Sequence, residues 1–231
     1  MNHTGAHRFA IIIPALDCES TIADVVRGAH DVLDTVVVVD DGSTDTTADR
    51  AAAAGAVVVR HERTRGKGAA LANGIQWAAR EGFTHAVTMD GDGQHIATEI
   101  PKLLERSRLH DGALVIGARD ARSSSTTRLR LFGNRFADRW VEIACGLALP
   151  DTQSGFRVYP IAMTSALGVR AHHFAFETEV LIRAVRAGIT IESVPVAVYY
   201  PPPGQRVSHY RGFVDTVRII FVVLGLIFRL W

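Results

Sequence analysis

The sequence has little of what would place it among disulfide-bonded, nucleic-acid-binding or membrane-spanning proteins. Its two cysteines, Cys18 and Cys145, are far apart and lack metal-ligand spacing, so we expect a reducing intracellular compartment. The formal net charge is only +1, which argues against a nucleic-acid-binding surface spread over the whole protein. The apolar run Ile219–Phe228 covers about 15 Å as a helix, half of a ~30 Å hydrocarbon core, and is too short to span a bilayer alone.

Short β-branched runs alternate with amphipathic helical stretches through the first half of the chain, and a hydrophobic content of 48% is ample for a core. The expected strands are Phe9–Ile13, Thr35–Val39, Val57–Val59, Ala86–Met89 and Ala113–Gly117. The expected helices are Ser20–Leu33, a second one ending at Ala54, Ala69–Arg80 and Thr98–Arg108. We expect Ser43 or Thr44 to cap the second helix and Gly55 to end it. This alternation predicts an α/β fold with a mostly parallel, Rossmann-like sheet and helices on both faces.

The second half is less regular and opens with a polar loop, Asp120–Thr127. Arginines that interleave with Leu, Phe and Trp side chains then predict a basic amphipathic helix running to about Ala144. These arginines are Arg119, Arg122, Arg128, Arg130, Arg135 and Arg139. Such helices lie on anionic membrane surfaces or bind phosphates, and an ordinary solvated helix face is the competing interpretation. A short strand, Val158–Tyr159, a helix, Phe174–Ala187, and an extended segment, Ile191–Tyr200, follow.

Residues 206–231 are interpreted as a separate C-terminal helix that follows a domain of residues 1–205. Arg218 and Arg229 bracket the apolar run. We expect an amphipathic helix in the membrane interface, with Arg229 and Trp231 at the level of the lipid headgroups. A helix packed in a protein–protein interface, for example between the subunits of a homo-oligomer, is the alternative.

The stretch after the fourth expected strand carries the strongest chemical signal. Asp90, Asp92 and Gln94 follow that apolar strand within five residues, with glycines between them. In an α/β sheet, ligands bind outside the carboxyl ends of the strands. Carboxylate and amide oxygens suit Mg²⁺ or Mn²⁺, which also take substrate phosphates as ligands. An acidic turn is the plain alternative, because Asp and Gly are ordinary turn residues.

A basic, glycine-rich loop, Arg63–Gly68, precedes the third expected helix. Its glycines allow an anion to approach the backbone, and the N-terminus of a helix favours negative charge. The loop lacks the spacing of a Walker P-loop. Lys67 within it is a candidate for stabilising a diphosphate.

Five motifs in order resemble those of glycosyltransferase family 2: Pro14–Asp17, Val39–Asp45, Gly66–Gly68, Asp90–His95 and Asp151–Arg157. Within the family, the chain is most similar to the polyprenol-phosphate sugar synthases of the dolichol-phosphate mannose or glucose type. The similarity covers roughly Phe9–Tyr200. It implies a GT-A fold and an inverting transfer of sugar from a UDP- or GDP-sugar, with Mg²⁺ or Mn²⁺ as the cofactor.

The resemblance also implies which residues bind the donor. Pro14, Ala15 and Asp17 would line the nucleotide, and Asp40 would hydrogen-bond its base. This chain has Asp17-Cys18 where the family usually has Asn-Glu, so the nucleotide preference stays open.

Asp92 and Gln94 would hold the metal on the diphosphate, and Asp90 would contact the ribose or the metal. Further donor-binding candidates are Gly42, Lys67 and Gly91. The candidates for phosphate contacts are Arg119 and Arg130, and the alignment can slip from Arg130 to Arg128. His95, next to the metal motif, is a weaker candidate for a diphosphate contact.

The need for a general base depends on the acceptor. A lipid phosphate with a second pKa of about 6 is already ionised at neutral pH, whereas a hydroxyl requires a positioned carboxylate. The candidates are Asp151, Glu177 and Glu179. Helical periodicity draws Glu177 toward the interior and leaves Glu179 in a plain surface ion pair with Arg183, whereas the family pattern places its acidic residue nearer Glu179. Both alternatives stay open.

We therefore expect a membrane-associated, metal-dependent glycosyltransferase that uses a polyprenyl phosphate or similar lipid, on the cytoplasmic face of the membrane. The same chemistry on a saccharide or glycolipid hydroxyl in cell-envelope synthesis is the first alternative. A sugar-1-phosphate nucleotidyltransferase and a non-catalytic nucleotide-binding protein are the others. The first of these would release pyrophosphate, and the second would bind without turnover.

Overall fold

The computed structural model describes residues 7–119, 139–171, 173, 175–200 and 212–228. The predicted loop Asp120–Thr127, Arg130 and most of the predicted basic helix lie outside these residues, although residues 139–145 are helical. The strands are β1 (Phe9–Ala15), β2 (Val36–Asp40), β3 (Val57–Arg60), β4 (His85–Thr88), β5 (Leu114–Arg119), β6 (Arg157–Pro160) and β7 (Ile191–Val196). The helices are α1 (Ile22–His30), α2 (Thr47–Ala53), α3 (Lys67–Arg80), the 3-10 helix η1 (Ala97–Glu99), α4 (Ile100–Leu109), α6 (Ile161–Ala166), α7 (Ala175–Arg186) and α8 (Gly212–Ile227).

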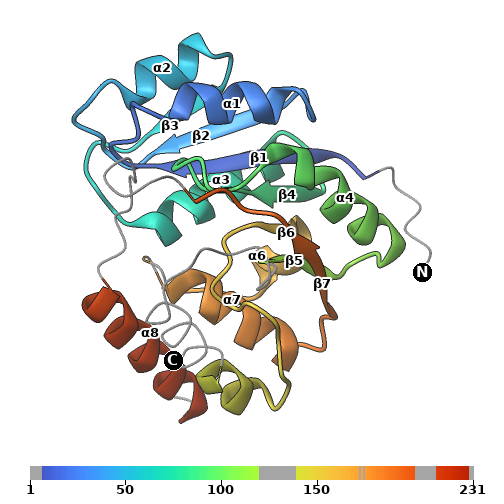
Figure 1. Ribbon diagram of the computed structural model, residues 1–231. Coiled ribbons are helices and arrows are strands. Elements are labelled where there is room, and N and C mark those ends of the chain that lie inside the picture. The colour runs from blue at the N-terminus through green and yellow to red at the C-terminus, as the bar shows by residue number, and fades with distance from the viewer. Residues whose placement is uncertain (1–6, 120–138, 172, 174, 201–211, 229–231) are drawn as a thin grey trace.

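The seven strands form one sheet in the order β3-β2-β1-β4-β6-β5-β7 (Figure 1). β1 pairs in parallel with β2 and β4, β2 pairs in parallel with β3, and β5 pairs in parallel with β7. Among the strands of the described residues, only β6 runs antiparallel to its neighbours, β4 and β5. The prediction of a mostly parallel sheet is confirmed, and all strands except β6 point their carboxyl ends to the same edge.

Helices cover both faces of the sheet, as predicted. α1, α2 and α4 pack on one face, against a cluster that includes Ile11 and Ile13 of β1. α3, α6 and α7 pack on the other face, where Ala10 and Ile12 of the same strand point. Alternate residues of one strand thus enter different cores, which explains why the strand sequence is apolar without interruption.

Several helix boundaries differ from the sequence prediction. α2 begins at Thr47, and neither Ser43 nor Thr44 caps it; instead the backbone N–H of Thr47 donates to Asp45 Oδ1 at 2.9 Å. Gly55 follows this helix with a φ of +101°, a conformation that only glycine adopts readily. α6, which the sequence analysis did not predict, begins directly after β6.

The final helix, α8, packs against α7 and the helical residues 139–145. Its residues Val222, Val223 and Leu226 are buried in this cluster, and Arg186 of α7 donates to the carbonyl of Leu226 at 2.8 Å. Phe221 points outward and is 68% exposed. No helix within the described residues is long and apolar enough to cross a membrane. The division of the chain at residues 205 and 206, and a membrane or interface role for α8, stay predictions.

Candidate active site

The candidate site residues follow the carboxyl ends of parallel strands. Asp17 follows β1, Asp40 ends β2, Asp90 follows β4 and Arg119 ends β5. Since these strands run in the same direction, the turns after them meet at one edge of the sheet. The topology therefore gathers there residues that are distant in the sequence.

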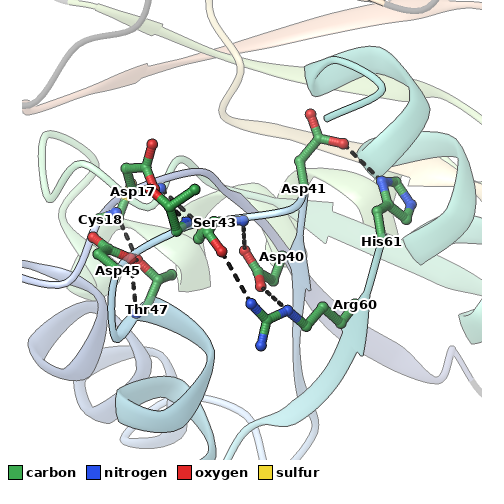
Figure 2. A network of polar contacts seen from close by, with 10 residues as sticks. Asp17, Cys18, Asp40, Asp41, Ser43, Asp45, Thr47, Arg60 and His61 are labelled. Atoms are coloured by element: carbon green, nitrogen blue, oxygen red, sulfur yellow. Dashed lines mark hydrogen bonds and ion pairs between the residues drawn. The ribbon is translucent and has the colours of Figure 1, made fainter. Parts of the chain in front are cut away.

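The turns after β1 and β2 are joined by hydrogen bonds (Figure 2). The backbone N–H of Asp17 donates to Ser43 Oγ at 2.9 Å, and Asp17 Oδ1 accepts from the N–H of Thr44 at 2.8 Å. The N–H of Cys18 donates to Thr47 Oγ1 at 2.7 Å. Asp17 has a φ of +45°, a strained conformation that these bonds hold in place.

Asp40 is fully buried, and its carboxylate is bonded within the protein. Asp40 Oδ1 accepts from the N–H of Ser43 at 3.0 Å, and Arg60 Nε lies 3.1 Å from Asp40 Oδ2. Pro14 and Ala15 pair with Val39 and Asp40 in the sheet and are buried. The contacts of these residues with a nucleotide stay predictions.

Asp41, which the sequence analysis did not single out as a site residue, organises the glycine-rich loop. It accepts from the N–H of Arg65 at 2.9 Å and from that of Gly66 at 2.7 Å. His61 Nδ1 lies 2.7 Å from Asp41 Oδ1, and the other ring nitrogen lies 2.8 Å from Asn73 Nδ2. This buried network orients the loop before a ligand binds, and Figure 2 shows the Asp41–His61 contact. Its sequence signal is only the second carboxylate of the Asp-Asp pair.

Gly42 allows the turn after β2 to approach this loop. Its φ is +79°, and a Cβ atom there would lie 2.8 Å from the backbone of Arg63 and Thr64. No side chain fits without displacing the loop. Gly42 therefore has a packing role, and direct contact with the donor stays a prediction.

Lys67, at the start of α3, connects two carboxylates from distant elements. Its Nζ lies 2.7 Å from Asp90 Oδ1 and 2.8 Å from Glu177 Oε1. Burial by itself would lower the pKa of Lys67, but the charges of Asp90 and Glu177 outweigh it and raise that pKa. Burial likewise opposes ionisation of Asp90, and the charge of Lys67 outweighs it and lowers the pKa of Asp90. Lys67 and Asp90 are therefore both charged at neutral pH.

Asp92 lies in a different electrostatic environment. Its carboxylate accepts from the N–H of Gln94 at 3.0 Å and from the Gln94 side-chain amide. Burial, and then the charge of Asp90, raise the pKa of Asp92. His95 Nδ1 accepts from the N–H of Asp90 at 2.9 Å, and its ring stacks on Phe156. The residues of the predicted metal motif are thus brought together, with Asp92 carrying charge that a cation would stabilise.

Gly155 lies directly against the Lys67–Asp90 ion pair, which the sequence analysis did not foresee. A Cβ atom at Gly155 would lie 2.8 Å from Lys67 Nζ and 3.1 Å from Asp90 Oδ1. The carbonyl of Gly155 accepts from Thr88 Oγ1 of β4 at 2.7 Å, which fixes the two segments together. A side chain at this position would therefore displace Lys67 Nζ from its place beside Asp90.

Arg157 holds the segment that carries Gly155. It is fully buried, and its guanidinium donates to the carbonyls of Ser154, Thr152 and Glu177, each within 2.8 Å. The cation thus ties the turn before β6 to the start of α7. Charged residues are rarely fully buried unless they are paired. An arginine within a short strand was therefore the sequence signal that could have indicated this buried contact.

Arg119 and Asp151 form a bidentate pair. Arg119 Nε donates to Asp151 Oδ2 at 2.7 Å, Nη2 donates to Oδ1, and the backbone N–H of Arg119 also donates to Oδ2 at 2.9 Å. Asp151 has a φ of +47°. A phosphate contact by Arg119 and a base role for Asp151 both stay predictions. Either role requires that the Arg119–Asp151 ion pair is kept while the residue also contacts substrate, or that the ion pair breaks.

Glu177 and Glu179 were the other two candidates for a base. Glu177 is buried, as its periodicity predicts, and it is paired with Lys67. The prediction that Glu179 forms a plain surface ion pair is wrong, because Glu179 is fully buried. It does bind Arg183, at 2.6 Å, but it also accepts from the N–H groups of Arg170 and Ala171. The segment before α7 that contains Arg170 and Ala171 covers Glu179. Helical periodicity cannot predict such a contact with another segment.

Most predicted site residues therefore meet at one edge of the sheet. Gly91 is buried beside Pro14 and Ala15, where a Cβ atom would make ordinary contacts. Arg130 and its alternative Arg128 lie outside the described residues.

Comparison with known proteins identifies the family of the chain. The model of the family described as "Glycosyl transferase family 2" matches residues 10–165. Glycosyltransferase AglJ of Haloferax volcanii is 34% identical over 197 residues, which are 84% of this chain and 63% of AglJ, so the chain spans less than two thirds of that relative. The undecaprenyl-phosphate mannosyltransferase of Micrococcus luteus is 33% identical over 172 residues, 70% of each chain.

Glucosyl-3-phosphoglycerate synthase from Mycobacterium tuberculosis, crystallised with Mg²⁺ and UDP, has a similar fold. The TM-score is 0.75 at 24% sequence identity, and the match covers 96% of this chain and 79% of that one. The expected GT-A fold is confirmed. On the match to the family model and to these relatives, the chain belongs to glycosyltransferase family 2 and is a glycosyltransferase.

Proposed function

We propose that this protein transfers a sugar from a nucleoside-diphosphate sugar to a polyprenyl phosphate or a similar lipid phosphate, with inversion at the anomeric carbon and with the help of a divalent cation. The observation that carries this proposal is the placement of Asp90, Asp92 and Lys67 at the carboxyl edge of the sheet, next to the turns after β1 and β2. An α/β sheet binds nucleotides at this edge.

The residues present fit a divalent cation. Asp92 and Gln94 offer hard oxygen donors, which Mg²⁺ and Mn²⁺ prefer. Within the described chain no cationic side chain forms a salt bridge with Asp92, and burial and the neighbouring Asp90 raise its pKa. We expect Asp92 to be the main ligand, with Asp90 and Gln94 as further ligands. A cation held there would neutralise the negative charge that develops on the leaving diphosphate.

The side chains around Asp92 have complementary roles in this proposal. Lys67 is held by Asp90 and Glu177 in one position, so its charge is oriented before the donor binds. Arg119 is fixed in the same way by Asp151 at the end of β5. Fixed cations stabilise a developing anion more than mobile ones, because they need no reorganisation during the reaction.

The state of the candidate bases supports an acceptor that is already ionised. Glu177 is paired with Lys67, Glu179 with Arg183, and Asp151 with Arg119. A cation bound to a carboxylate favours its ionised form, so these pairs disfavour proton transfer from a hydroxyl to the carboxylates. A lipid phosphate needs no such base. The similarity to an undecaprenyl-phosphate mannosyltransferase points to the same class of acceptor.

A lipid acceptor requires the protein to reach a membrane surface. We propose peripheral attachment at the cytoplasmic face, to which the exposed Phe221 of α8 and Phe228, directly after this helix, would contribute. A homo-oligomer formed through this helix is the alternative role for the same side chains. Flotation with anionic vesicles separates the two, because Phe221→Ser would reduce vesicle binding only in the first case.

The acceptor can be tested with two matched lipids. The protein is incubated with labelled UDP- or GDP-sugars and Mn²⁺, and with either a polyprenyl phosphate or the corresponding polyprenol. We expect transfer to the phosphate and none to the alcohol. Transfer to the alcohol or to a saccharide alone would exclude the proposed acceptor.

The alternative, transfer to a hydroxyl, has its own signature. It requires a base, so Asp151→Asn or Glu177→Gln would abolish transfer while donor binding persists. With a lipid phosphate as acceptor, Glu177→Gln retains measurable transfer.

A further inference from the structure

A second cluster of ligand-type side chains lies at the opposite edge of the sheet. β1 and β4 are parallel, and Phe9 at the start of β1 pairs with His85 at the start of β4. His7 lies two residues before β1, and Asp111 lies in the turn between α4 and β5. This cluster is thus at the amino-terminal ends of β1 and β4, away from the candidate active site.

The three side chains are close enough to share an ion. One ligand atom from each lies within 4.8 Å of the others. His7 Nε2 and Asp111 Oδ1 are 3.1 Å apart, and the ring centroids of His7 and His85 are 4.5 Å apart. Ligands at about 2.0–2.1 Å from a tetrahedral zinc ion lie about 3.3 Å from one another. Small side-chain movements would therefore form a binding site.

A buried nitrogen atom of His85 is the second, independent observation that points to a bound ion. The residue is 4% exposed, and its Nε2 atom is buried with no hydrogen-bond partner among the residues that the structure describes. Nδ1 lies 2.9 Å from Thr84 Oγ1, and this hydroxyl accepts from the N–H of Arg8 at 2.9 Å and donates to the carbonyl of Arg8 at 3.3 Å. In the tautomer whose Nδ1–H donates to Thr84 Oγ1, Nε2 carries the lone pair and is free to bind an ion. Metal-binding histidines are held in this way by an outer partner.

The protonation state agrees with a ligand role. Burial, and then the proximity of His7, lower the pKa of His85 to about 4. The imidazole is therefore neutral at physiological pH and able to coordinate an ion. A buried polar atom without a partner is costly, and an ion at Nε2 would remove that cost.

We propose that His7, His85 and Asp111 bind a zinc ion that fastens the start of β1 to β4 and to the turn after α4. Two imidazole nitrogens and one carboxylate oxygen suit Zn²⁺, whereas Mg²⁺ and Ca²⁺ prefer oxygen ligands alone. The side chain of Asp111 is 62% exposed, which gives the ion a path from solvent. A water molecule or another group would complete the coordination.

Calorimetric titration with ZnCl₂ tests this site. The full chain without an affinity tag is stripped with EDTA, and all measurements use an Asp92→Asn background to remove binding at the candidate active site. We expect one site that Mg²⁺ does not compete for, weakened at least about 10-fold by His7→Ala and by Asp111→Asn, since loss of an outer partner of a ligand alone costs that much. His110→Ala is the matched control, because His110 is adjacent to Asp111 but pairs with Glu192, and it keeps the affinity.

Thermal unfolding gives a second readout. Free Zn²⁺ at 100 times the Kd of the Asp92→Asn protein would raise the Tm of that protein by about 5–10 °C. The same zinc concentration would raise the Tm of the His7→Ala and Asp111→Asn derivatives by about half of that or less. The proposal is overturned if the Asp92→Asn protein binds no zinc in the micromolar range. It is also overturned if the two derivatives bind zinc as tightly as their parent.

Discussion

Replacing Lys67 by Met tests the ion-pair centre of the site. Lys67 Nζ lies 2.7 Å from Asp90 and 2.8 Å from Glu177, and the side chains of Lys67 and Glu177 are 16% and 6% exposed. Removing one partner of a buried ion pair costs about 3–5 kcal/mol, because the other charge is left uncompensated. Asp90 is 30% exposed and can be partly hydrated, so we expect the lower end, about 3 kcal/mol.

The assay is urea unfolding at neutral pH in EDTA, followed by circular dichroism. Lys102→Met is the matched control, because Lys102 is 52% exposed and pairs with Glu99 on the surface, where removal costs about 0–1 kcal/mol. A second substitution, Glu177→Gln, removes one of the two repelling carboxylates and is expected to restore about 1–2 kcal/mol to Lys67→Met. Equal stability of the Lys67→Met and Lys102→Met proteins would refute the reasoning.

Three further predictions follow from packing and burial. Gly155→Ala pushes a methyl group into the Lys67–Asp90 ion pair, so kcat/KM for sugar transfer should fall about 100-fold. Gly28→Ala is the control and should leave kcat/KM unchanged, because a Cβ atom there meets Ala97 at an ordinary 3.5 Å. Equal rates in the two variants would contradict the role of Gly155. Gly42→Ala adds strain at a φ of +79° and a clash with the neighbouring loop, so urea unfolding should show a loss of about 1–3 kcal/mol, and an unchanged midpoint would contradict this. Burial raises the pKa of Cys18 to about 12 and that of Cys145 to about 11. Iodoacetamide at pH 8.5 should therefore label native Cys145 about 100-fold, and native Cys18 about 1,000-fold, more slowly than the unfolded thiols, whose pKa is about 8.5. The native protein should lose stability as the pH rises above that value, because the unfolded thiols ionise first. Native labelling at the unfolded rate would contradict both expectations.

The sequence predicted what depends on local pattern. The uninterrupted apolar runs identified the parallel strands, because both faces of the sheet are covered and neighbouring residues such as Ile11 and Ile12 pack into different cores. The abrupt change from an apolar strand to Asp90 and Asp92 indicated which edge of the sheet carries the candidate active site. Family resemblance then supplied the fold and the reaction class.

Contacts between distant segments could not be predicted. The antiparallel β6 has only four residues, and its place between β4 and β5 depends on pairing across the whole sheet. The buried position of Glu179 depends on the backbone of Arg170 and Ala171 folding over α7. The pairing of Lys67 with Glu177 joins α3 to α7, which only the tertiary fold brings together.

The central claim is that Asp92 helps to hold a divalent cation on which transfer to a lipid phosphate depends. The most direct measurement is the initial rate of sugar transfer to a polyprenyl phosphate across a Mn²⁺ titration, for the EDTA-treated protein and its Asp92→Asn variant. Asp34→Asn, at an exposed position, is the matched control. We predict a rate that rises from near zero with Mn²⁺ in the wild type and the control, and a rate at least about 100-fold lower in Asp92→Asn at saturating Mn²⁺. Equal rates and equal Mn²⁺ dependence in all three proteins would contradict the account.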